Sequence, residues 1–92
     1  MIVGTLKLRL IVRESRSLKD KRQVIKSIKD RIRGGFNVSV AEVDSLDSQQ
    51  EAVLGVAVVT NERRHAQEVL SQVLNLARTH PVAQLLDHEL EV

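Results

Sequence analysis

The stretch from Ser15 to Arg33, SRSLKDKRQVIKSIKDRIR, constrains the fold most, because its pattern is that of a helix with a defined start. Apolar residues recur every three or four positions, which predicts one buried face on a helix over residues 18–33. Ser17 is the predicted N-cap, and Asp20 stands where a capping box has Glu or Gln. Gly34 and Gly35 follow at once, which predicts that a glycine in the left-handed conformation closes the last turn of this helix. The apolar residues are Leu18, Val24, Ile25, Ile28 and Ile32.

The same helix carries a row of cations beside its apolar face. Five positive side chains step by three or four residues and fall within a sector of about 80°. Lys21 differs, because its angle places it within the apolar face. Such a row can follow a nucleic-acid backbone, and the alternative is a solvated helix face with Asp30 nearby. The five cations are Lys19, Arg22, Lys26, Lys29 and Arg33.

The remaining elements give the order βαββαβ. Strands are predicted at residues 2–13, 36–43, 52–60 and 82–91. A polar hairpin is predicted at residues 44–50. Asn61 is the predicted N-cap of a second helix over residues 62–79, which His80–Pro81 ends. This order favours one α+β domain over residues 1–92, a ferredoxin-like sandwich of a four-stranded antiparallel sheet with two helices on one face.

Two helices on one face leave the other face of the sheet open. This open face would carry Lys7, Arg9 and Arg13 beside many aliphatic side chains. That much aliphatic surface favours burial against another copy, so we expect a homodimer or higher homo-oligomer. The predicted interface residues are Val3, Ile11, Val43, Val53, Ala57 and Val59.

Charge is divided unevenly along the chain. Residues 1–33 hold 11 Lys/Arg and 3 Asp/Glu, a net charge of +8, whereas residues 34–92 hold 3 and 9, a net charge of −6. The division indicates a basic surface for an anionic partner, most plausibly RNA or a ribosomal surface. The alternative is that the two parts neutralise each other after folding.

The start of the first helix is a second candidate anion site, because free N–H groups and the positive end of the dipole meet there. The strand before the helix ends, and the hairpin turns, at this same end of the sheet. The alternative is therefore that Lys21 and Arg22 pair with hairpin carboxylates, namely Glu42, Asp44 or Asp47. The candidate anion-binding residues are Arg16, Ser17, Lys19, Lys21, Arg22, Lys26, Lys29 and Arg33.

Composition argues against several other functions. The chain has no cysteine, hence no disulfide, thiolate nucleophile or cysteine-based zinc site. No apolar run is long enough for a membrane span. The first strand contains Lys7 and Arg9, whereas a signal peptide has an unbroken apolar region, so a cytoplasmic protein is expected. No serine or carboxylate pair accompanies a positioned base, so no catalytic residue, metal or cofactor is predicted. Phe36 is the single aromatic residue and is assigned to the core, which argues against base stacking.

Two stretches resemble the YlxP-like family of small bacterial proteins. One is Ser17–Asp44, and the other runs from Asp47 and Gln50 into Ala52–Asn61. The resemblance implies a ferredoxin-like fold but no catalytic residues, and the family is largely uncharacterised, with genes that often lie near translation and ribosome-maturation genes. Its members usually carry a tryptophan in the hairpin, about where Gln49 stands here.

These observations favour a non-enzymatic, oligomeric binding protein whose basic helix meets RNA or a ribosome. The alternative is an ACT-like regulatory module, which shares this fold and binds small molecules at subunit interfaces.

Overall fold

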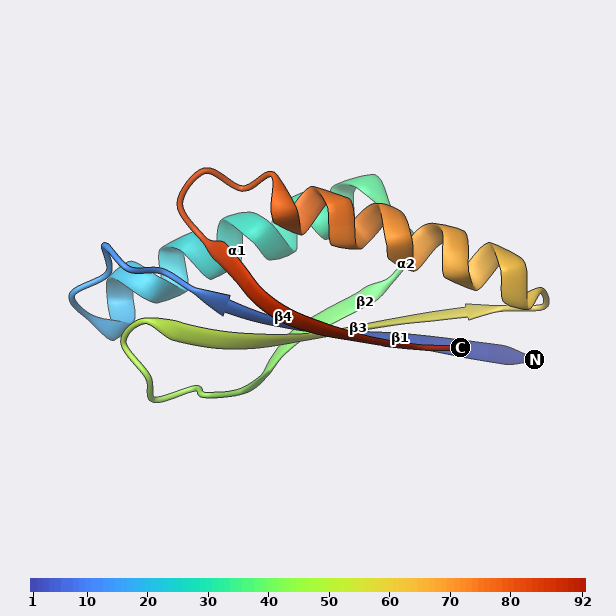
Figure 1. Cartoon of the computed structure of the whole chain (residues 1–92), viewed down its shortest axis with the longest axis horizontal. Helices are drawn as coiled ribbons and strands as arrows, with labels where there is room; N and C mark the ends of the chain where they lie inside the picture. Colours follow the sequence, from blue (N-terminus) through green and yellow to red (C-terminus); the bar gives the residue numbers. More distant parts are fainter.

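The computed structural model describes all 92 residues and confirms the order βαββαβ (Figure 1). The elements are β1 (Ile2–Ile11), α1 (Leu18–Gly35), β2 (Ser39–Asp44), β3 (Glu51–Thr60), α2 (Arg63–Arg78) and β4 (Gln84–Glu91). The four strands form one antiparallel sheet in the order β2-β3-β1-β4, and both helices lie on one face of it. The predicted ferredoxin-like α+β arrangement is confirmed. Neither helix is long and apolar enough to cross a membrane.

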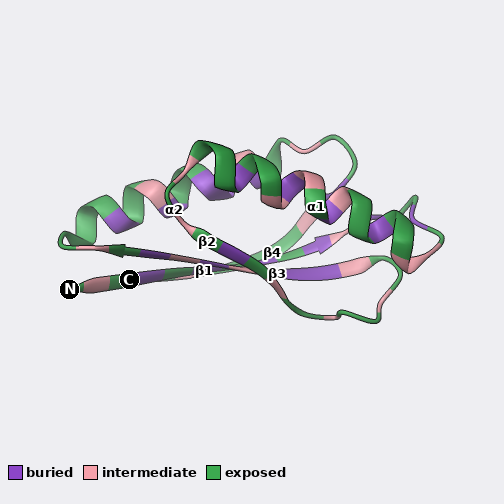
Figure 2. Cartoon of the chain, turned by 180° about the vertical axis from the view of Figure 1, so that it is seen from behind, coloured by how far each residue is buried: buried purple, intermediate pink, exposed green.

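The core lies between the helices and the sheet, where Figure 2 shows the buried segments. Alternate residues of β1, such as Leu6, Leu8 and Leu10, point toward the helices and are fully buried. They meet the isoleucine face of α1 and the apolar face of α2. Burial of each such side chain stabilises the fold by about 1.5–3 kcal/mol. The two helices sit over different strands, because α1 packs beside β2 whereas α2 covers β1 and β3.

The predicted end of the first helix was wrong. Helix α1 continues through Gly34 and Gly35, and neither glycine has a positive φ. The turn to extended backbone comes at Phe36, whose N–H donates to the carbonyl of Ile32 at 3.0 Å. Phe36 packs against the core, as predicted, but the strand begins at Ser39 instead of residue 36.

The limits of α2 also differ from the prediction. Asn61 is not the N-cap; Glu62 takes that place without a side-chain cap, and its N–H donates to Thr60 Oγ1 at 3.3 Å. After the helix, the His80 Nδ1 atom accepts hydrogen bonds from the N–H groups of Val82 and Ala83, at 3.2 and 3.1 Å. This turn delays the start of β4 to Gln84, two residues later than predicted.

Candidate functional site

The start of α1 is capped by its own side chains. Ser17 Oγ accepts a hydrogen bond from the Asp20 N–H at 3.1 Å, and Asp20 Oδ2 accepts one from the Arg16 N–H at 3.1 Å. Ser15 Oγ donates to the Ser17 carbonyl at 2.9 Å. The predicted cap is confirmed, and it engages Ser17. Ser17 Oγ thus has a structural role as acceptor at the helix start, while its O–H donor is not used by the cap.

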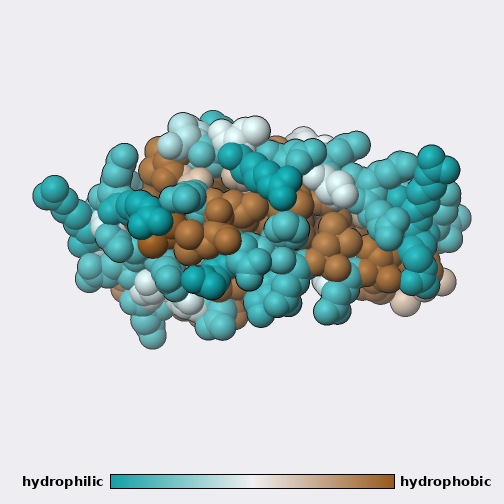
Figure 3. All heavy atoms as spheres, in the orientation of Figure 1, coloured by the Kyte–Doolittle hydropathy of each residue, from teal (hydrophilic) through white to brown (hydrophobic).

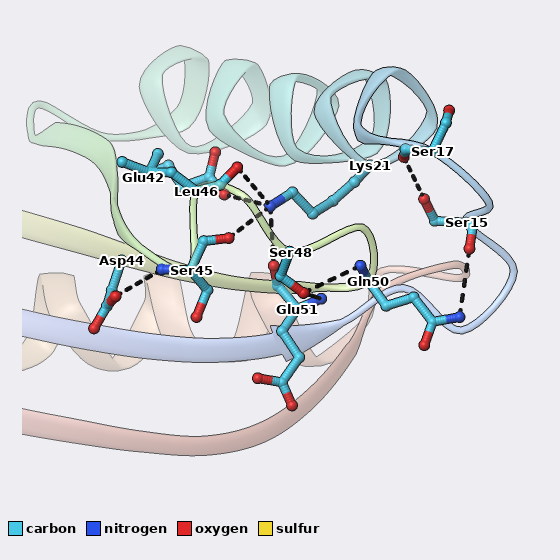
Figure 4. Close-up of polar contacts among 10 residues, drawn as sticks. All are labelled: Ser15, Ser17, Lys21, Glu42, Asp44, Ser45, Leu46, Ser48, Gln50 and Glu51. Carbon is cyan, nitrogen blue, oxygen red and sulfur yellow. Dashed lines mark hydrogen bonds and ion pairs between the residues drawn. The ribbon is translucent and has the colours of Figure 1, made fainter.

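Lys21 extends from α1 into the hairpin and is fully buried (Figure 4). Its Nζ lies 2.9 Å from the Ser45 carbonyl oxygen and 3.0 Å from that of Glu51. A carboxylate oxygen of Glu42, on β2, lies 3.0 Å from the same nitrogen and balances its charge. The Leu46 carbonyl follows at 3.5 Å. Because these partners enclose the fully buried ammonium, Lys21 cannot reach an external anion, which corrects its place among the predicted anion-binding residues.

The Lys21 contacts fix the conformation of the hairpin. Ser45 adopts a positive φ of 57°, which is strained for a residue with a side chain. The ammonium holds the Ser45 carbonyl, and Asp44 Oδ1 accepts from the Ser45 N–H at 2.7 Å. Gln50 Nε2 donates to the Arg13 carbonyl at 3.1 Å, which ties the hairpin to the end of β1. The predicted meeting of helix start and hairpin is confirmed.

Five cations on α1 form what we call the basic flank: Lys19, Arg22, Lys26, Lys29 and Arg33. The flank lies about 110° around the helix from the middle of the buried face, so it points sideways from the core. Arg33 Nη2 donates to the Val40 carbonyl on β2 at 2.9 Å. The basic flank therefore lies on the side of α1 that is nearest to the β2 edge of the sheet. Arg31 lies on the other flank, where its charge acts on His80.

Asp30 is the one carboxylate that forms ion pairs with the basic flank. Lys26 Nζ lies 2.9 Å from Asp30 Oδ2, and Arg33 Nη1 lies 3.9 Å from Asp30 Oδ1. The hydrogen bond from Lys26, aided by the neighbouring cations, holds the pKa of the Asp30 carboxyl below its usual value. Lys19, Arg22 and Lys29 form no ion pair. The basic flank thus keeps most of its charge in the folded chain.

The cations of β1 are in a different position. Lys7 pairs in register with Glu89 of β4, and Arg9 pairs with Asp87, so opposite charges face each other across the two strands. Arg13 Nε donates to Gln84 Oε1 at 3.1 Å. Mutual neutralisation, one of the two alternatives for the charge division, is thus favoured by the strand register of β1 and β4, although no ion pair joins these side chains. On the basic flank, by contrast, five cations have one carboxylate, Asp30, beside them.

The predicted interface residues differ in exposure on the open face. Val3, Val43 and Val59 are 49%, 54% and 66% exposed, whereas Ile11 and Ala57 are half-buried. Val53 also faces this side, because it pairs in register with Arg9, but its side chain is only 6% exposed in the single chain. A hollow of about 500 Å³ crosses this face at the strand centres.

Sequence reasoning left the partner of Lys21 open among several carboxylates. The alternation of the strand holds the missing signal, because Glu42 is two residues from the buried Val40 and shares its core-facing side. The hydrogen bond from Arg33 to the Val40 carbonyl could not be predicted in this way, since every residue has a backbone carbonyl and the sequence does not show which one is free at a sheet edge.

Comparisons with known proteins agree with this fold and leave the chemistry open. The model of a family described as a protein of unknown function (DUF503) matches residues 3–90. The uncharacterized protein YlxP of Bacillus subtilis (strain 168) is 32% identical over 80 residues, which are 87% of this chain and 87% of that protein. A de novo designed protein with ferredoxin fold, solved by solution NMR, superposes with a TM-score of 0.59 at 11% identity, covering 100% of this chain and 87% of the design.

Proposed function

The chain belongs to the DUF503 family of proteins of unknown function, and from the placement of its charges we propose that it is a non-enzymatic binding protein whose basic flank holds the phosphate backbone of RNA. One observation carries the proposal. The cations of β1 lie opposite carboxylates of β4 in strand register. On α1, Lys19, Arg22 and Lys29 form no ion pair, and Asp30 is the one carboxylate paired with the basic flank. Uncompensated cations along one surface are what favours binding of a polyanion through counterion release.

The geometry supports contact along a backbone. The basic flank spans residues 19–33, which corresponds to about 21 Å of helix at 1.5 Å per residue. It forms an outer side of the molecule above the β2 edge, clear of the open face of the sheet. A row of cations of this length suits a phosphate chain better than it suits a small ligand.

The mode of recognition follows from the lack of stacking groups. Phe36 is the single aromatic residue and packs against the core. Sequence-specific readers of single-stranded RNA splay bases onto aromatic side chains, and this chain exposes none. We therefore expect recognition of backbone and shape, with little preference for base sequence.

A matched pair of variants tests the proposal. Replacing Lys19, Arg22 and Lys29 with Gln removes three unpaired charges from the basic flank. Binding weakens with every phosphate that the helix no longer neutralises, so we expect at least a tenfold rise in the Kd for a fluorescent RNA hairpin, measured by anisotropy at low salt.

The control variant carries Arg9→Gln, Arg64→Gln and Arg78→Gln, which lowers the net charge by the same three units at sites away from the flank. Its Kd should stay within about threefold of the wild-type value. Equal weakening by both variants would show that net charge, and not the basic flank, governs binding, and would contradict the proposal.

A further inference from the structure

The open face of the sheet has the pattern of a protein interface. Toward β2 and β3 it is apolar, with Val43 and Val59 more than half exposed. Toward β4 it is polar, with Lys7 and Arg9 set among Asp87, Glu89 and Glu91. The face therefore combines an apolar half over β2 and β3 with a half over β1 and β4 that carries charges of both signs, and contacts between proteins contain both kinds of surface.

The hollow on this face results from small side chains. Thr5, Ala41, Gly55 and Ala57 alternate onto the open face of three neighbouring strands and form its floor. Val43 stands beside them, close enough that a Cβ atom on Gly55 would lie 3.0 Å from its Cγ1. The face therefore carries both a protruding valine and a hollow. A two-fold contact needs both features on one surface, because each copy must offer what the other receives.

The size of the face also fits a second copy. The strands hold 10, 6, 10 and 8 residues, so at about 3.4 Å per residue and about 4.8 Å per strand the face measures about 550 Å² before side-chain relief is added. Stable complexes bury about 800 Å² of accessible surface on each partner, a value in the same range. A polyanion fits this face poorly, because carboxylates of β4 stand directly opposite the cations Lys7 and Arg9.

We propose that the open faces of two copies of this chain pack against each other in a two-fold sandwich, with valine side chains of each copy seated over the small-residue hollow of the other. The helices then lie on the two outer sides, so both basic flanks stay accessible. The dimer does not depend on the proposed RNA binding, and the two are tested by different measurements.

The mass of the protein in solution tests the dimer. Sedimentation equilibrium of the wild type should give twice the chain mass of 10.3 kDa. Val43→Glu places a carboxylate beside the hollow, and Val59→Glu places one near the end of β3 on the same apolar half of the face. Made separately, each should raise the dimer dissociation constant at least tenfold. Both valines are exposed in the single chain, so each variant should keep its circular dichroism spectrum and remain folded.

Two further variants keep the test specific. A second hydrophobic surface could also bind another copy, and the controls address it. Figure 3 shows hydrophobic residues on the side of the molecule where β4 and α2 are nearest the viewer, and Leu86 of β4 is 36% exposed. Leu86→Glu and Val82→Glu, the latter in the turn before β4, should leave the dimer intact. A monomeric wild type at millimolar concentration overturns the proposal. So does a dimer that resists both Val43→Glu and Val59→Glu, or one that Leu86→Glu alone dissociates.

Discussion

Lys21 is a charged side chain that the fold has removed from water. Its ammonium is held by Glu42 and by carbonyls of the hairpin, all within 3.5 Å. The desolvation cost of a buried pair offsets much of its attraction, so such a pair adds little net stability relative to an apolar replacement of both partners. Its consequence is conformational: one hairpin geometry satisfies the ammonium, and other geometries leave it unpaired.

Replacing Lys21 with Met keeps the length of the side chain and removes its charge. Glu42 is then left as a carboxylate with an 11% exposed side chain and no cation, and the hairpin carbonyls no longer have their donor. We expect the free energy of unfolding to fall by about 3 kcal/mol or more, measured by urea denaturation.

Lys26→Met is the matched control, because its ion pair with Asp30 is largely exposed. The fall in its free energy of unfolding should be below about 0.5 kcal/mol. Equal effects of the two substitutions would contradict the structural role assigned to Lys21.

His80 makes stability depend on pH. Burial, with a smaller effect of the Arg31 charge, lowers the pKa of His80 below its usual value of about 6.5. The unfolded chain therefore binds a proton more readily than the folded chain. The contribution of His80 is complete above pH 6.5 and is lost as the pH falls from 6.5 through the lower folded pKa.

His80→Asn separates this titration from the rest of the molecule. The Asn amide oxygen can accept from the Val82 and Ala83 N–H groups in place of Nδ1, and it does not titrate. Thermal unfolding at pH 7.5 and pH 5.5 should show a smaller fall in Tm for the variant than for the wild type. An identical fall in both proteins would refute the role of His80.

At the scale of the element, α1 carries two glycines in its last turn. Neither has a positive φ, and a Cβ at either position meets no atom within 4 Å. Gly34→Ala should therefore stabilise the protein by about 0.5–1 kcal/mol, because alanine loses less backbone entropy in a helix. Urea denaturation measures the gain.

Gly4→Ala is the contrasting variant. A Cβ there would lie 3.0 Å from Leu70 Cδ1 and 3.3 Å from Ala66 Cβ, against the inner face of α2. It should destabilise the protein. A destabilising effect of Gly34→Ala would mean that the helix end needs the flexibility of glycine, as the Gly-Gly pair predicts.

Periodicity predicts the elements well, because buried faces repeat at 3.6 or 2.0 residues. The burial of Leu6, Leu8, Ile28 and Ile32 follows from this repeat alone. Helix ends were less predictable. A Gly-Gly pair predicts that a residue in the left-handed conformation ends the helix. In the structure the helix continues to Gly35 and ends where Phe36 packs against the core. On the basic flank, the pairing of Lys26 with Asp30 follows from their i,i+4 spacing. The contact of Arg33 with the Val40 carbonyl was not predictable, since it depends on where β2 lies beside the helix.

At the scale of the whole molecule, charge and apolar surface are separated. The basic flank lies over the β2 edge, and the open face holds exposed valines beside charges of both signs. Lys21 ties the hairpin to the start of α1. Two copies joined by their open faces would present two basic flanks on outer sides. A polymer could then be bound at two places at once, which raises its overall affinity without any new contact.

The salt dependence of RNA binding tests the central claim most directly. Contacts with Z phosphates give a slope of log Kobs against log salt concentration of about −0.7Z to −0.9Z. We expect a steep slope for the wild type and a slope shallower by about 2 for the variant that lacks Lys19, Arg22 and Lys29. No binding by the wild type at low salt, or the same slope in both proteins, would contradict the assignment of the basic flank as the RNA-binding surface.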